Sequence, residues 1–222
     1  MLPVLVVAAA LVGQAGAAQN ATVSGRLILV EDGSAVEDAA EFEHAVVYFR
    51  PDNLDAVQAP AEALAMTTSR RQFQPRVLTI TPGTEVIFPN EDPILHNVFS
   101  SSAGNRFDLG LYGRSDGKTH RFDQPGLVRV FCNVHPAMSA HILVVDTPHF
   151  VTPNDEGHFV IHDLPLGPGR LTLWHERAEA RHIDLDLHGG ELALEATELP
   201  LTIRQLGQQR DRIRRPTRRG RY

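Results

Sequence analysis

Short β-rich segments, separated by Gly, Pro, Asn and Asp, make up most of this 222-residue chain. Beyond the first residues, no stretch has the periodicity of an amphipathic helix. Turn residues such as those of Thr81-Pro-Gly-Thr84 separate the segments. Closely spaced strands of this kind predict an all-β protein built of antiparallel sandwiches. Only the Ala-rich residues 54–68 favour a helical turn. We expect strands at residues 22–30, 45–49, 76–80, 85–88, 127–131, 140–145, 158–162, 170–174, 183–187 and 192–201.

The run Phe131-Cys-Asn-Val-His-Pro-Ala-Met138 holds the only cysteine of the chain. His135 follows Cys132 after three positions, and Met138 follows His135 after three more, all between two predicted strands. With His96 from a neighbouring strand end, the set comprises one thiolate, two imidazoles and one thioether. These are the ligands of a blue-copper electron-transfer site, a trigonal His₂Cys arrangement with a weak axial Met. The pattern predicts one copper ion held by these four side chains.

Zinc is the competing metal for this ligand set, but a structural zinc site uses four Cys or His ligands, and Met is a poor substitute. Met138 could also be ordinary core filler, which the ligand spacing makes the weaker interpretation. The other histidines, including His158, His162 and His175, are interpreted as surface or capping residues, because no second ligand set accompanies them. Glu91 and Asp92 are interpreted as shaping the turn before His96.

The first residues predict export. Residues 1–18 combine a short apolar run with small residues at its end, which is typical of a secretory signal peptide, although an uncleaved anchor is the alternative. A lone cysteine in an oxidising compartment needs an explanation, and a thiolate held by copper supplies one. We therefore expect a periplasmic protein.

The net charge of −6 is unevenly distributed, since residues 204–222 carry eight arginines and one aspartate. Such a tail is interpreted as a solvated, disordered terminus. The functional alternative is a polybasic arm that makes weak contact with an anionic membrane or an acidic partner. Nucleic acid is not expected as a partner, because the chain is predicted to be exported and the tail lacks interleaved aromatic residues.

Residues 72–146, which include these four predicted ligands, resemble the cupredoxins, most closely amicyanin and plastocyanin. The matching pieces are Thr81-Pro-Gly-Thr-Glu-Val-Ile-Phe88, the pair His96-Asn97, and the short Cys-x₂-His-x₂-Met loop with Pro136 after the histidine. The resemblance implies a Greek-key β-sandwich, here residues 62–147, with one type 1 copper at one end. It also implies that Asn97 hydrogen-bonds to the cysteine loop, that Phe131 is the usual aromatic residue before the thiolate, and that the ring edge of His135 reaches the surface.

The flanking segments, 20–58 and 148–203, resemble the two halves of a carboxypeptidase regulatory-like β-sandwich. The resemblance implies a binding or spacer module without catalysis. Our hypothesis is that the copper domain is inserted in, or lies next to, this second small sandwich. Between His96 and Cys132, the apolar segment 105–113 either forms a lid near the metal or packs at the sandwich edge, and edge packing is favoured.

These observations predict a periplasmic electron carrier that shuttles single electrons between redox partners such as a dehydrogenase or a c-type cytochrome. An enzyme is not expected, because no catalytic triad, recognisable carboxylate pair or phosphate loop is present. One alternative is a copper-binding or copper-sensing module without turnover. A second is an interaction protein that keeps the sandwich and stays metal-free.

Overall fold

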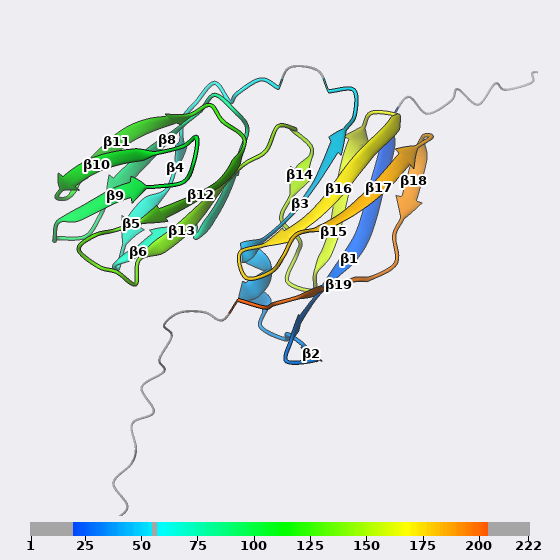
Figure 1. Cartoon of the computed structure of the whole chain (residues 1–222), viewed down its shortest axis with the longest axis horizontal. Helices are drawn as coiled ribbons and strands as arrows, with labels where there is room; N and C mark the ends of the chain where they lie inside the picture. Colours follow the sequence, from blue (N-terminus) through cyan, green and yellow to red (C-terminus); the bar gives the residue numbers. More distant parts are fainter. Residues whose placement is uncertain (1–19, 55–56, 204–222) are drawn as a thin grey trace, which may run out of the picture.

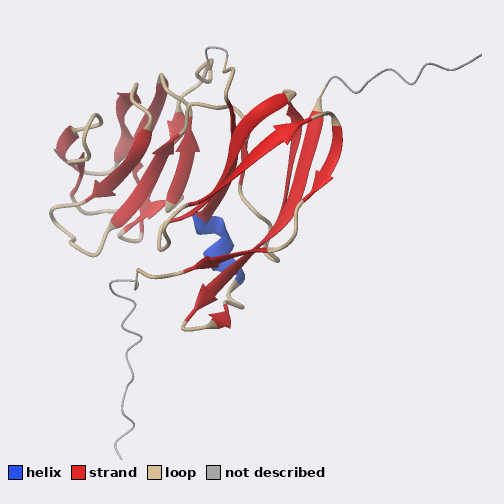
Figure 2. Cartoon of the chain, turned by 45° about the vertical axis from the view of Figure 1, so that its right-hand side comes forward, coloured by secondary structure: helices blue, strands red, loops and turns tan. Residues whose placement is uncertain are grey.

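The structure, a computed structural model, describes residues 20–54 and 57–203. Figures 1 and 2 show two β-sandwiches side by side. In the described residues the one helix is a short 3₁₀ helix, η1 (Ala39–His44), which Asp38 caps by accepting the N–H of Ala40 at 3.1 Å. The all-β class is therefore confirmed. The predicted signal peptide and the basic tail, residues 204–222, lie outside the described residues. Within residues 20–54 and 57–203, no helix has the length and apolarity needed to cross a bilayer.

The outer sandwich is the unit made by residues 21–51 and 150–201. In its first sheet, β1 pairs with β15, β18, β19 and β2. Its second sheet has the order β14-β3-β16-β17. The strands of the outer sandwich are β1 (Ala21–Glu31), β2 (Ser34–Ala35), β3 (Ala45–Pro51), β14 (Phe150–Val151), β15 (His158–Leu164), β16 (Gly167–His175), β17 (Arg181–Leu187), β18 (Gly190–Ala193) and β19 (Thr197–Pro200).

The inner sandwich is the unit made by residues 64–145. Its sheets have the orders β10-β9-β12-β13-β7 and β11-β8-β5-β6, with β4 paired to β8. The strands of the inner sandwich are β4 (Leu64–Ala65), β5 (Thr67–Ser69), β6 (Gln72–Gln74), β7 (Val77–Ile80), β8 (Thr84–Asn90), β9 (His96–Ser100), β10 (Phe107–Tyr112), β11 (Ser115–Phe122), β12 (Gly126–Phe131) and β13 (Ser139–Val144).

Each sandwich has its own apolar core. In β8, every second residue from Thr84 to Asn90 is buried, which is the alternation of a strand with one face on the core. Phe88 and Phe122 anchor the inner core, and Phe49 and Leu171 anchor the outer one. Fully burying one such side chain stabilises the fold by about 1.5–3 kcal/mol.

A third apolar cluster joins the two sandwiches. Its buried members are Val46 and Trp174 from the outer sandwich, and Val77, Leu143 and Val145 from the inner one. Because these side chains are removed from water only when the sandwiches are in contact, the cluster fixes how the two units sit against each other.

The structure shows the conformation of the described part of residues 54–68 and the position of residues 105–113, which the sequence left open. The helical turn favoured within residues 54–68 is wrong, since the described part is extended and contains β4 and β5, whose pairing with β8 satisfies their backbone groups. The segment 105–113 contains β10, an edge strand paired with β9, as edge packing predicts. The Tyr112 hydroxyl donates to the Phe88 carbonyl at 2.9 Å, which ties this edge to the facing sheet.

Candidate metal centre

The predicted ligands gather at one end of the inner sandwich. Cys132 directly follows β12, His135 lies in the loop between β12 and β13, and His96 is the first residue of β9. Potential ligand atoms of these three residues all lie within 4.8 Å of one another. The Nδ1 atom of His96 is 3.8 Å from the sulfur of Cys132, and the two imidazole rings are 4.8 Å apart at their centroids. The structure therefore brings the predicted thiolate and both imidazoles together.

Met138 closes the same loop. Its side chain is buried in the inner core together with Cys132. Its backbone N–H donates to the His135 carbonyl at 2.8 Å, which makes a tight turn at the end of the loop. The axial role of its sulfur stays a prediction.

The donor set fits a soft or borderline metal. Cys132 is a buried free thiol, and a thiolate in such a place needs a compensating positive charge. The Nδ1 atom of His135 is buried and has no hydrogen-bond partner among the described residues. A buried polar nitrogen without a partner is costly, and a metal ion beside it would remove that cost.

Asp92 orients His96, a role that the sequence reasoning missed. The Nε2 atom of His96 lies 2.9 Å from a carboxylate oxygen of Asp92, and the histidine is fully buried. Burial favours the protonated carboxyl, but hydrogen bonds from the backbone N–H groups of Arg71 and Arg70 outweigh it and lower the pKa of Asp92. An ionised Asp92 keeps the proton of His96 on Nε2, so that Nδ1 presents its lone pair toward Cys132. The only local signal was the short separation of Asp92 and His96 in the sequence, which predicts no side-chain contact outside a helix.

Replacing Asp92 with asparagine is expected to weaken copper binding by about 10–100-fold, the usual cost of losing a hydrogen-bond partner of a metal-ligating histidine. The Asp92 carboxylate accepts three hydrogen bonds, whereas the asparagine amide would turn an NH₂ group toward at least one of these donors. Competition with a chromophoric copper chelator measures the change. The matched control is Asp116→Asn in β11, because Asp116 is an exposed carboxylate. Equal affinities for both variants would contradict the orienting role.

Asn97 links the ligand loop to two strands. Its side-chain oxygen accepts the backbone N–H of Asn133 at 3.0 Å, and its amide donates to Asp108 of β10 at 2.7 Å. Phe131 packs against Phe99, with ring centroids 6.0 Å apart. Pro136 lies exposed directly after His135. The loop is therefore braced from β9 and β10 at the position next to the thiolate.

Four exposed apolar side chains lie in the segments that carry the ligands or in the strand paired with one of them. We call these residues the apolar collar: Ile94, Leu95, Leu111 and Val134. Leu95 and Val134 directly precede the two histidines, and Leu111 pairs in register with Asn97. His135 itself is partly exposed. Exposed apolar side chains next to metal-ligating residues suit contact with another protein.

A second group with metal-ligand chemistry, Glu41, His44 and His175, lies in the outer sandwich. His175 is fully buried, which contradicts its interpretation as a surface or capping residue, and burial lowers its pKa to about 4. Its Nδ1 accepts the N–H of Arg177 and its Nε2 donates to the Glu41 carbonyl, both at 3.1 Å. The Glu41 carboxylate is paired with the Arg177 guanidinium at 2.9 Å. Since the His175 ring and the Glu41 carboxylate already have hydrogen-bond partners, we interpret this group as a structural network.

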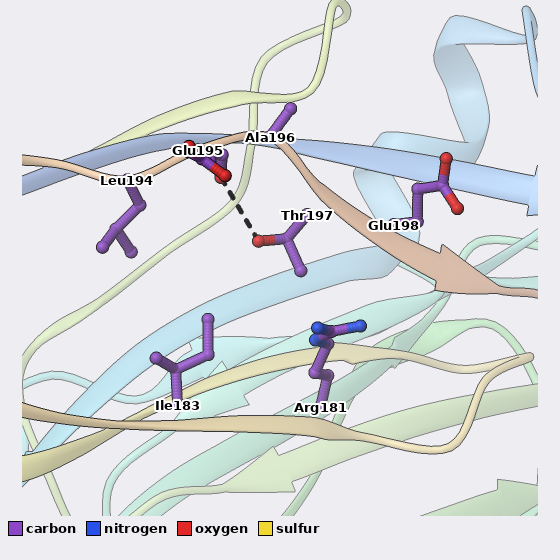
Figure 3. Close-up of a pocket in the computed structure, with 7 residues that line it drawn as sticks. All are labelled: Arg181, Ile183, Leu194, Glu195, Ala196, Thr197 and Glu198. Atoms are coloured by element: carbon purple, nitrogen blue, oxygen red, sulfur yellow. Dashed lines mark hydrogen bonds between the residues drawn. The ribbon is translucent and has the colours of Figure 1, made fainter.

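A surface hollow also lies in the outer sandwich, between β17 and the chain that joins β18 to β19 (Figure 3). The Thr197 hydroxyl donates to the Glu195 carbonyl at its wall. Its lining contains neither histidine nor cysteine, so it offers no site for a soft metal. The lining residues are Arg181, Ile183, Leu194, Glu195, Ala196, Thr197 and Glu198.

Comparison with known proteins places the inner sandwich in a known group. The chain is 30% identical to amicyanin-alpha of Methylorubrum extorquens over 95 residues, which cover 41% of this chain and 80% of that protein. Among solved structures, a purple cupredoxin from Nitrosopumilus maritimus matches with 22% identity and a TM-score of 0.34, covering 37% of this chain and 99% of that one. Amicyanin from Paracoccus versutus matches with 20% identity and a TM-score of 0.36, covering 44% and 98%.

A copper-containing nitrite reductase from Thermus scotoductus also matches, with 22% identity and a TM-score of 0.38, over 54% of this chain and 28% of that one. No family model matches the sequence. The predicted likeness of the flanking segments to the carboxypeptidase regulatory-like sandwich stays a prediction. The extent of the match to amicyanin-alpha, together with the thiolate and imidazoles gathered at one end of the inner sandwich, shows that the chain belongs to the amicyanins, a family of type 1 copper cupredoxins.

Proposed function

We propose that this chain is a periplasmic carrier of single electrons that holds one copper ion through His96, Cys132, His135 and Met138 and catalyses no reaction of its own. At the level of the family, it is a blue copper electron-transfer protein. The observation that carries the proposal is the convergence of the Cys132 sulfur with nitrogens of His96 and His135, two of the three residues being buried.

Copper bound there would supply one-electron chemistry between its cuprous and cupric states. The protein's contribution is rigidity. Asp92 fixes the ring of His96, Asn97 fixes the backbone beside Cys132, and the burial of Cys132 and Met138 keeps water away from the sulfur atoms. Ligands held in one arrangement move little when the charge of the site changes, and a small rearrangement favours rapid electron exchange.

The partner is proposed to be a redox protein such as a dehydrogenase or a c-type cytochrome, docking on the apolar collar. Leu95, Leu111 and Val134 are each about half exposed, and Val134 directly precedes the partly exposed His135. A small apolar contact of this kind suits a transient complex, since weak electron-transfer encounters bury little area.

Adding copper(II) to the purified protein tests the proposal. We expect an intense thiolate-to-copper absorption band in the visible range and reversible one-electron voltammetry. Tight copper(I) binding without reversible voltammetry would instead favour the copper-binding or copper-sensing module. The absence of any copper complex would favour a metal-free interaction protein.

The axial role of Met138 has its own test. Met138→Leu is expected to keep the blue colour, because Cys132 and both histidines remain. The reduction potential should rise, since loss of a sulfur donor weakens copper(II) binding more than copper(I) binding, by about 59 mV for each tenfold difference. Voltammetry of both proteins measures this. Met66→Leu, at another buried methionine of the inner core, is the control and should leave the potential unchanged.

Export and the insertion of the copper domain are further parts of the proposal. The strands of the outer sandwich come from before and after the inner one, since β1 pairs with β15 and β3 pairs with β16. This pairing supports an inserted domain at residues 62–147. Cell fractionation of the full chain, followed by mass measurement of the mature N-terminus, tests the predicted cleavage near residue 18.

A further inference from the structure

A buried carboxylate of the outer sandwich reaches the inner one beside the ligand loop. Glu176 lies in the turn between β16 and β17, and its side chain is 1% exposed. Both carboxylate oxygens accept from the Nε atom of Arg76, at 2.7 and 2.8 Å. The Nδ1 atom of His141, in β13, lies 3.0 Å from one of them. Two residues of the inner sandwich therefore meet one acid of the outer sandwich.

Glu176 is held in its ionised form. Burial acts to raise its pKa, but the contacts with His141 and Arg76 outweigh burial and lower the pKa to about 2. The third neighbour, His44, lies 3.5 Å away, and burial lowers its pKa, which disfavours its charged form. Arg76 is accordingly the permanent cation that Glu176 holds.

Arg76 connects Glu176 to the end of the ligand loop. Its guanidinium also donates to the carbonyl of Ser139 at 3.3 Å, and its own carbonyl accepts the N–H of His141 at 2.8 Å. Ser139 is the residue after Met138, and it pairs with Phe131 to close the loop between β12 and β13. Asn97 and Asp92 brace the other side of the site, whereas Arg76 and the β12–β13 pairing hold the exit of the loop.

We propose that Glu176 is a positioning residue of the copper centre, which acts through Arg76 and Ser139 to hold the loop that carries His135 and Met138. This inference rests on the proposed function, because it assigns the loop as the copper-ligand loop. The outer sandwich is then a structural part of the metal site, and a copper domain cut out at residues 62–147 would lack one of its supports.

The test uses the full chain with Glu176→Leu, which keeps the bulk of the side chain and removes the acceptor. In the copper-free protein we expect hydrogen exchange at the amides of Met138 and His141 to become at least tenfold faster. In the copper-loaded protein we expect faster copper release to a chelator and a shifted reduction potential. Glu176→Gln keeps one acceptor for Arg76 and should restore part of each property.

Asp146→Asn is the matched control. It breaks another ion pair between the sandwiches, Arg50 with Asp146 at 2.8 Å, which does not involve the ligand loop. The control should leave exchange at Met138 and the potential unchanged. If Glu176→Leu changes neither loop exchange nor potential, or if Asp146→Asn changes both equally, the positioning role is overturned.

Arg76→Lys separates the two contacts of the arginine and guards against a Glu176 variant that does not fold. Lysine keeps a cation for Glu176 but lacks the second arm that reaches Ser139, so exchange at Met138 should still accelerate. Unchanged exchange in this variant would count against the proposed route. The hydrogen-exchange measurement needs no metal. If the wild-type protein forms no blue copper centre, the proposed function is refuted, but the exchange rates still show whether Glu176 holds the loop.

Discussion

Replacing Cys132 with serine is expected to abolish the intense visible band of the copper-loaded protein. The band requires a thiolate bonded to copper(II), and Cys132 is the only cysteine of the chain. Losing a neighbour of a ligand typically weakens metal binding about 10–100-fold, so losing the thiolate itself should exceed that range. Optical titration with copper(II) measures both the band and the affinity.

Asn133→Ser provides the control for Cys132→Ser. Asn133 is the next residue of the same loop, it is exposed, and its hydrogen bond to Asn97 uses the backbone N–H rather than the side chain. The control should keep the band. Retained colour in the Cys132 variant would refute the ligand assignment, because no other thiolate could produce it.

Gly157→Ala is expected to destabilise the outer sandwich by more than about 3 kcal/mol, because a strained backbone and a steric clash add together. Gly157 has a φ of +83°, and an added Cβ would lie 2.1 Å from the Leu27 carbonyl oxygen and 2.8 Å from the ring of Phe42. The same glycine accepts the N–H of Leu27 at 2.8 Å, so the strands cannot separate without breaking that bond.

Urea unfolding followed by the fluorescence of Trp174, the only tryptophan, measures the effect of Gly157→Ala. Gly33→Ala is the matched control, because Gly33 has a φ of +82° but nothing within 4 Å of an added Cβ. It should cost only about 1–2 kcal/mol for the left-handed backbone. Similar unfolding midpoints for the two variants would show that the contact with Leu27 is unimportant.

Local patterns were sufficient to predict much of this structure. The β-rich run at residues 85–88 predicted the centre of β8, and the turn Thr81-Pro-Gly-Thr84 forms with Gly83 at a φ of +84° and a 3.2 Å hydrogen bond from Thr84 N–H to the Thr81 carbonyl. The spacing of Cys132, His135 and Met138 predicted a single loop, and that loop exists because β12 and β13 are hairpin partners.

Contacts between residues distant in sequence could not be predicted in this way. Glu176 meets Arg76 across 100 positions, and no local pattern marks an acid in a turn as buried. His175 looked like a surface residue, yet its ring is enclosed by η1, which itself has too few residues to show a helical period. Asp92 was assigned to the turn before His96, and its second role depends on the neighbouring turn at Arg70 and Arg71.

The apolar cluster of Val46, Val77, Leu143, Val145 and Trp174 has a consequence for encounters with other molecules. If the two sandwiches were joined only by a flexible linker, the metal end would rotate relative to the outer sandwich. The apolar contact between the two sandwiches prevents this rotation and holds the metal end at one orientation relative to the outer sandwich. A redox partner of the kind proposed above would therefore have to fit the shape of both sandwiches, and not of the metal-bearing one alone.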